Sequence, residues 1–316
     1  MKMRLAWCYY YWVAFIIALG AIARIDVDIG FAKVEAFGTV VYGPTAKELI
    51  LLTSKLAANE GHESFCTCAP GQETLSRRLM YGSSDDESND DDESIDDVTV
   101  RAKPISSSED IQDALTKANA LILICHDTPI QEKALNTLLN AAGSDLSKIV
   151  LLSKMGVTAG KGGGFFGGNS KLMDSENTVR SLCKSKNLDF SIVRAGQLKG
   201  GGPGEPADND YGLSKKYYNT LFELSEASCT MAHDRFTMGV DCSKGDTVDV
   251  PNPLMLFGTK TSFDAAPYDT NRINAAMAAV MAAIHDKPVE FSVGAEKAEA
   301  PPSKQEWEGI IETMEV

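Results

Sequence analysis

Hydrophobic runs alternate with amphipathic stretches along the chain from residue 39 onward, and each alternation has the length of a strand followed by a helix. Residues 39–68 give the clearest example, with a β-branched run, a turn that starts at Gly43, and helix formers over residues 46–58. Leucines recur at helical spacing in that last stretch, so one face of the helix is apolar. The pattern predicts a strand–helix–strand unit whose helix packs against a sheet.

The same alternation continues towards the C-terminus. Residues 148–153 form a continuous apolar run, which is typical of a strand buried on both faces of a parallel sheet. Further expected strands cover residues 98–102, 120–127, 188–201 and 289–294, and further expected helices cover residues 107–118, 130–142, 174–187, 268–286 and 303–314. We therefore predict an α/β fold, a doubly wound parallel sheet of the Rossmann-like kind with a smaller C-terminal substrate or cap region.

The turn after the first strand has the chemistry of an anion-binding turn. Its residues are Gly43, Pro44, Thr45, Ala46 and Lys47. Main-chain N–H groups at the start of a helix hold a pyrophosphate, and small side chains let that group approach the backbone. A glycine turn between a strand and a helix is therefore typical of a dinucleotide-binding half.

This turn resembles the GxTGxxG turn of the atypical short-chain dehydrogenase/reductase superfamily, the NmrA-like NAD(P)-binding group in particular. Gly43 and Thr45 occupy its first and third places. Ala46 and Leu49 stand where its second and third glycines would be. A leucine at that point puts bulk between helix and strand, so either the helix packs further from the sheet or the phosphate is held differently.

Two later segments carry the same resemblance. A helix with Glu176 followed by a strand with Arg194 is similar to the family's "sgldyTivRpg.l.g" segment, and the stretch at 268–286 resembles its "sRadvA..v..aL" helix. The matching residues are Glu176, Asp189, Ile192, Val193, Arg194, Gly196, Leu198, Arg272 and Ala276. The resemblance implies an NAD(P)-binding Rossmann core over residues 37–198. Residues 199–316 would complete the sheet and form the substrate region.

The resemblance also implies an oxidoreductase that moves a hydride between nicotinamide and a carbonyl, usually with a Tyr, a Lys and a Ser at the reacting group. Ser153 matches the family's serine position, and Lys171 is the early lysine of the helix that should hold the Tyr–Lys pair. That helix contains no tyrosine. Tyr211 and Lys215 copy the YxxxK signature, but they follow the Arg194 strand and so fall at the wrong place in the sheet. We take Ser153 and Lys171 as candidate catalytic residues.

The expected cofactor is NADP, with NAD as the second option. NAD-binding proteins hold the ribose hydroxyls with an acid at the end of the second strand, and this chain has no acid there. Arg77 and Arg78 lie just downstream and suit a 2′-phosphate, although a solvated helix face explains them equally well. Ser153 and Gly156 would lie near the nicotinamide. For Arg194 we expect a structural salt bridge.

The implied function is an NADP-dependent reductase that acts on a small carbonyl compound or quinone. The alternative is a catalytically inactive NAD(P)-binding regulatory or assembly factor on the same fold, with a membrane complex as its partner. The net charge of −14 argues against nucleic acid as a partner. Residues 82–97 are a Ser, Asp and Glu run that predicts a disordered acidic insertion. The seven cysteines and four histidines are scattered, which predicts neither a disulfide framework nor a metal site.

The N-terminus predicts a targeting signal. Lys2 and Arg4 precede an apolar run of about 17 residues, so residues 1–23 are expected to be a secretory signal peptide or a signal anchor. Residues 24–36 would be a linker. Entry into the secretory route leaves two destinations open, an endomembrane lumen and the plastid of a complex-plastid alga.

Overall fold

The computed structural model describes residues 37–45, 47–82, 101–158, 168–200, 211–214, 238–247 and 269–316. The expected signal at 1–23, the linker at 24–36 and the acidic insertion from residue 83 onward lie outside these residues. Among the helices that are described, none is both long and apolar enough to cross a membrane.

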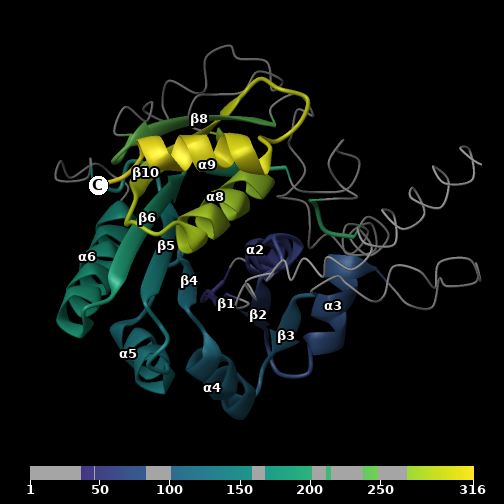
Figure 1. The fold of residues 1–316 in the computed structure, drawn as a ribbon. Coiled ribbons are helices and arrows are strands. Elements are labelled where there is room, and N and C mark those ends of the chain that lie inside the picture. The colour runs from purple at the N-terminus through teal and green to yellow at the C-terminus, as the bar shows by residue number, and fades with distance from the viewer. Residues whose placement is uncertain are drawn as a thin grey trace, which may run out of the picture. The chain divides into compact units, whose positions relative to one another are not determined.

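Strands and helices alternate along the described chain up to residue 195, as the hydrophobic pattern predicts, and three more strands follow before the next described helix (Figure 1). The first half contains β1 (Gly38–Tyr42), α2 (Lys47–Asn59), β2 (Glu63–Thr67), α3 (Glu73–Tyr81), β3 (Lys103–Ile105), α4 (Ser108–Lys117), β4 (Ala120–Ile124), α5 (Glu132–Ala141) and β5 (Lys148–Lys154). The second half contains α6 (Gly168–Lys186), β6 (Asp189–Ala195), β7 (Gln197–Lys199), β8 (Gly239–Lys244), β9 (Asp269–Asn271), α8 (Arg272–Ile284), β10 (Glu290–Glu296) and α9 (Lys304–Thr313).

One sheet holds eight of these strands in the order β3-β2-β1-β4-β5-β6-β10-β8. All neighbours are parallel except β8, which pairs antiparallel with β10. The chain builds outward from β1 to β3, returns to β4 beside β1, and then builds outward in the other direction. This is the strand order of a doubly wound dinucleotide-binding sheet, so the predicted Rossmann-like fold is confirmed.

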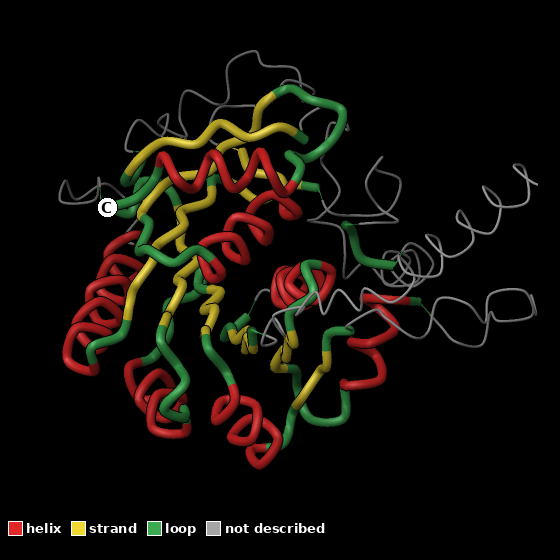
Figure 2. Tube along the Cα trace, viewed as in Figure 1, coloured by secondary structure: helices red, strands yellow, loops and turns green. Residues whose placement is uncertain are grey.

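Helices cover both faces of the sheet (Figure 2). On one face α2 and α8 pack against each other, and their side chains form one apolar cluster with Val41, Ile122 and Val193 of the strands. On the other face α4, α5 and α6 pack side by side over Val40 and Leu121. Every residue of β4 is buried, which is the expected consequence of a strand covered on both sides.

Local sequence signals fix several helix starts. The Ser107 hydroxyl accepts a hydrogen bond from the N–H of Asp110 at 3.0 Å and so caps α4. Ser303 and Glu306 form a reciprocal capping box at the start of α9. These caps satisfy N–H groups that the first helical turn cannot pair.

Three strands differ from the sequence-based expectation. Residues 269–271 were expected to belong to the helix at 268–286, but they form β9, and α8 begins only at Arg272. The third strand was expected at 98–102. Residues 98–100 lie outside the described residues, 101 and 102 are not in a strand, and the described strand begins at Lys103 and contains Pro104. Proline lacks the N–H of a ladder bond and is tolerated because β3 is the edge of the sheet. Strand β8 was not expected at all. Half of its six residues are polar, because it forms the opposite edge of the sheet, where several of its residues are exposed.

Candidate functional site

The strand order reverses between β1 and β4, and ligands of doubly wound sheets bind in the crevice at the carboxyl ends of such strands. The β1–α2 turn and the β4–α5 loop leave the sheet side by side at this edge. The hydroxyl of Thr45 in the first donates a hydrogen bond to the hydroxyl of Thr128 in the second, at 2.9 Å. The candidate site is therefore this edge of the sheet.

Gly43 allows the two strand ends to pack closely at the reversal. A Cβ atom on Gly43 would lie 2.7 Å from the carbonyl oxygen of Ile124 and 3.0 Å from the Cδ1 atom of Ile50. Pro44 and Thr45, which follow, are exposed, while the predicted Ala46 lies outside the described residues. The Leu49 side chain, which replaces a glycine of the related turn, is buried in the core. It therefore does not cover the exposed outer side of the start of α2.

Lys47 forms a hydrogen bond between the start of α2 and the segment after β2. Its Nζ atom donates a hydrogen bond to the Oε1 atom of Gln72 at 2.9 Å. Gln72 directly precedes α3, which carries Arg77 and Arg78 on its exposed face beyond its first turn. The structure thus brings Lys47 to the crevice side of β2 and leaves the two arginines on the outer surface of α3.

Ser153 and Gly156 lie at the end of β5. Ser153 is almost fully buried, with 1% of its surface exposed. Gly156 has a φ of 76°, a backbone conformation that favours glycine. Its N–H donates to the Oδ1 atom of Asp246 at 2.8 Å, and the N–H and hydroxyl of Thr158 donate to the Oδ2 atom of Asp246 at 2.7 and 2.8 Å. The Asp246 carboxylate therefore holds the β5–α6 loop in place through these hydrogen bonds. No sequence pattern indicated this role.

A second group missed by the sequence analysis joins the ends of β4 and β5. The Oδ1 atom of Asp127 lies 3.1 Å from the Nδ1 atom of His126 and 3.2 Å from the Nζ atom of Lys154. His126 is buried, and its Nε2 atom lies 2.6 Å from the carbonyl oxygen of Gly196. The contact with His126 and the charge of Lys154 hold the pKa of the Asp127 carboxyl well below its usual range. An ionised carboxylate paired with a lysine therefore lies where β4 and β5 end.

Helix α6, where the catalytic pair of a short-chain reductase was expected, contains no tyrosine, and Lys171 near its start is exposed. The helix instead supplies Glu176 to a buried ion pair. The carboxylate of Glu176 accepts hydrogen bonds from the Nε and Nη2 atoms of Arg194 at 3.1 and 2.8 Å. Glu290 of β10 accepts another from Nη2 at 2.8 Å. The structural salt bridge expected for Arg194 is therefore present.

The YxxxK tyrosine also lies away from α6. Tyr211 is partly buried and packs against the apolar cluster on the α2 face. Lys215 lies outside the described residues. Tyr211 is therefore assigned to packing.

No protein-family model and no curated protein sequence matches this chain. Solved structures with a similar fold include a Bacillus halodurans protein assigned as an NAD-dependent epimerase/dehydratase, at 13% identity and a TM-score of 0.49, covering 88% of this chain and 100% of that one. A short-chain dehydrogenase/reductase from Veillonella parvula, in complex with NADP, has 10% identity and a TM-score of 0.45 over 84% of this chain and 99% of its own. The UDP-N-acetylglucosamine 4-epimerase from Bacillus cereus has 10% identity and a TM-score of 0.40, over 86% and 82% of the two chains. At these values the likeness concerns the fold alone.

Proposed function

We propose that this chain binds a nicotinamide dinucleotide, NADP rather than NAD, along the carboxyl edge of β1, β4 and β5, and reduces a small carbonyl compound or quinone. The observation that carries this proposal is the reversal of strand order between β1 and β4, with the Gly43 turn and the start of α2 at the point of reversal. The proposed class is an oxidoreductase of the atypical short-chain reductase type.

The residues at this edge fit such a cofactor. Pro44 and Thr45 are exposed at the start of α2, where a pyrophosphate would meet main-chain N–H groups, and the Thr45–Thr128 hydrogen bond joins the β1–α2 turn to the β4–α5 loop. Lys47 would lie on the ribose side of β2. The cofactor, when bound, supplies the hydride. Lys154 would hold a proton near the substrate oxygen at its Nζ atom.

A second candidate function is supported by one specific observation. Helix α6 has no tyrosine, and the side chain of its Lys171 is exposed to solvent. A protein of this kind would bind NAD(P) and act as a regulatory or assembly factor for a membrane complex without turnover. The two candidates share the cofactor and differ in chemistry.

The first test is a titration of the purified full chain with NADPH and NADH, followed by nicotinamide fluorescence. We expect saturable binding with NADPH preferred. Thr45→Trp should weaken binding at least tenfold, because an indole at the helix start blocks the pyrophosphate, whereas Thr137→Trp on the exposed side of α5 should not. Binding of neither cofactor would refute both candidates.

NADPH consumption with a panel of small aldehydes, ketones and quinones then separates the two candidates. Turnover that is lost in Thr45→Trp supports the reductase. Saturable binding without turnover of any member of the panel supports the regulatory or assembly factor.

The localisation is a separate proposal that rests on residues 1–23. The chain would enter the secretory route and reach an endomembrane lumen or the plastid of a complex-plastid alga. A fluorescent fusion of the full chain should enter that route, and a fusion that lacks residues 1–23 should stay in the cytosol. Equal distribution of the two fusions would contradict the proposal.

A further inference from the structure

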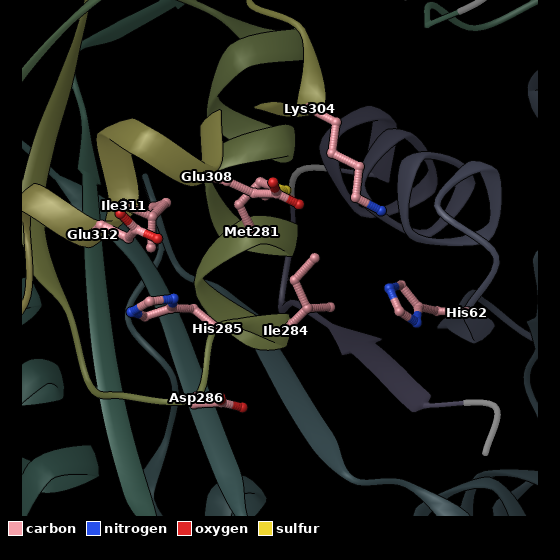
Figure 3. Close-up of a pocket in the computed structure, with 9 residues that line it drawn as sticks. All are labelled: His62, Met281, Ile284, His285, Asp286, Lys304, Glu308, Ile311 and Glu312. Atoms are coloured by element: carbon pink, nitrogen blue, oxygen red, sulfur yellow. The ribbon is translucent and has the colours of Figure 1, made fainter. Parts of the chain in front are cut away.

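A pocket of about 310 Å³ lies at the amino edge of the sheet, opposite the dinucleotide crevice. His62, which directly precedes β2, lines one side, and residues from the end of α8 and from α9 line the rest (Figure 3). Because β2 and β10 are parallel to the other central strands, the residues before them lie at the edge away from Gly43 and Ser153. The volume falls in the lower range of pockets that hold small molecules.

Two helices end at this pocket. Helix α2 ends at Asn59, three residues before His62, and α8 ends at Ile284, which itself lines the pocket. The last carbonyl groups of a helix carry a partial negative charge, which a basic residue in the last turn usually offsets. Neither α2 nor α8 has a basic residue in its last turn. At the end of α8 this charge is offset from another element, because the Nζ atom of Lys148 donates a hydrogen bond to the carbonyl oxygen of His285, so the backbone contribution to the pocket comes from the end of α2.

The charged side chains add to the negative potential. Asp286, Glu308 and Glu312 line the pocket, and Lys304 is its only ammonium group among the described residues. Lys304 already forms an ion pair with Glu60 on the neighbouring turn, with its Nζ atom 2.7 Å from the Oε2 atom. The lining thus holds three carboxylates and one lysine. Outside the lining, the charges of Lys148 and Lys287 act on Asp286, and that of Lys287 acts on Glu312. Glu308 is therefore the carboxylate of the lining most available to a ligand.

The floor of the pocket is apolar. Met281 and Ile311 are buried, and Ile284 is half-buried beside them. His62 closes the side and packs edge-on against the ring of Phe37, with ring centroids 5.5 Å apart. Burial and the nearby Lys304 hold the pKa of His62 below its ordinary value, so its imidazole is neutral at neutral pH and does not repel a cation. Figure 3 shows Glu308 and Ile284 on facing parts of the same space.

We propose that this pocket binds a small organic cation, a protonated amine that carries a short apolar body. The ammonium group would be held by Glu308, and the apolar body would cover Met281, Ile284 and Ile311. This site is independent of the dinucleotide crevice and of the reaction proposed there. A neutral ligand would gain only the apolar part of the interaction.

The test is a ligand-observed NMR titration of the full chain with three probes of matched shape: phenethylammonium, 2-phenylethanol and phenylacetate. We expect phenethylammonium to bind with a dissociation constant on the order of 1 mM, which is reasonable for a ligand of this size. The alcohol should bind at least about threefold more weakly and the carboxylate should not bind measurably.

Variants of Glu308 identify the pocket, because this residue is exposed and its replacement leaves the core intact. Glu308→Gln should weaken phenethylammonium binding about threefold to tenfold, and Glu308→Lys should abolish it. Glu109→Gln, an exposed glutamate on α4, is the matched control and should change nothing. Equal binding of the alcohol and the amine, no binding of the amine, or full binding by Glu308→Lys would each overturn the proposal.

Discussion

Replacement of Arg194 by methionine should destabilise the fold strongly, because it leaves a buried carboxylate without its cation. The Arg194 side chain is 1% exposed and that of Glu176 is 5% exposed. Burial opposes the charge of Arg194, but Glu176 and Glu290 outweigh it and raise its pKa. Loss of one partner of a buried ion pair typically costs about 3–5 kcal/mol. A domain is stable by only about 5–15 kcal/mol, so this variant would lose a third or more of its stability.

The double variant Arg194→Met/Glu176→Leu should be more stable than Arg194→Met alone. It buries apolar groups in place of the unpaired carboxylate, and Glu290 keeps a cation because Arg180 lies 3.0 Å from its Oε2 atom. In the wild type, the hydrogen-bonding capacity of the Arg194–Glu176 pair is not fully used, since the buried Nη1 atom of Arg194 has no hydrogen-bond partner among the described residues. We expect the double variant to recover at least about 1–2 kcal/mol of the loss.

The measurement is urea unfolding of the full chain, followed by far-UV circular dichroism, for the wild type, both single variants and the double variant. In Arg194→Met the carboxyl of Glu176 can take up a proton on folding, so the stability deficit should be smaller at pH 5 than at pH 8. A loss below about 1 kcal/mol in Arg194→Met, or a double variant less stable than the single one, would refute the reasoning.

Three further changes test other parts of the structure. Gly43→Ala should lower the free energy of unfolding by about 1–3 kcal/mol, because its Cβ would press on the β4 backbone. Gly309→Ala, which lies in open space on α9, should raise the free energy of unfolding by up to about 1 kcal/mol. Equal effects of the two substitutions would contradict the packing argument. Ser303→Ala removes the cap of α9 and should cost about 1 kcal/mol in urea unfolding, and no loss would mean that the cap is not formed in solution. If the arginines of α3 bind a 2′-phosphate, Arg77→Ala/Arg78→Ala should lower the ratio of NADPH to NADH affinity in titrations. An unchanged ratio would assign them to a solvated helix face.

Most of the fold follows from hydrophobic periodicity, and the exceptions have physical causes. Strands such as β4 and β5 are covered on both faces, so their sequences are continuous apolar runs of strand length. Edge strands lack that signal. Strand β3 contains Pro104 and only three residues, and β8 is half polar and has no continuous apolar run, so neither stands out from a loop in the sequence.

The candidate site was predicted less completely than the fold. The Gly43 turn could be recognised because its residues are contiguous, and the pairing of Arg194 because a buried arginine on a strand needs a carboxylate. The group of His126, Asp127 and Lys154 could not be recognised in this way, because β4 and β5 bring their ends together only in the folded sheet.

The contacts of Asp246 have a consequence for the order in which this protein can be completed. Asp246 follows β8, and β8 joins the sheet through β10, the last strand along the chain. The centre of the sheet, from β1 to β6, is present in the sequence long before either of them. A nascent chain that has emerged only as far as β6 therefore has its crevice strands but lacks the carboxylate that fixes the loop after β5. The nicotinamide end of the proposed site is then the last part of the sheet edge to take its final form during synthesis, because it must wait for a contact that spans about 90 residues.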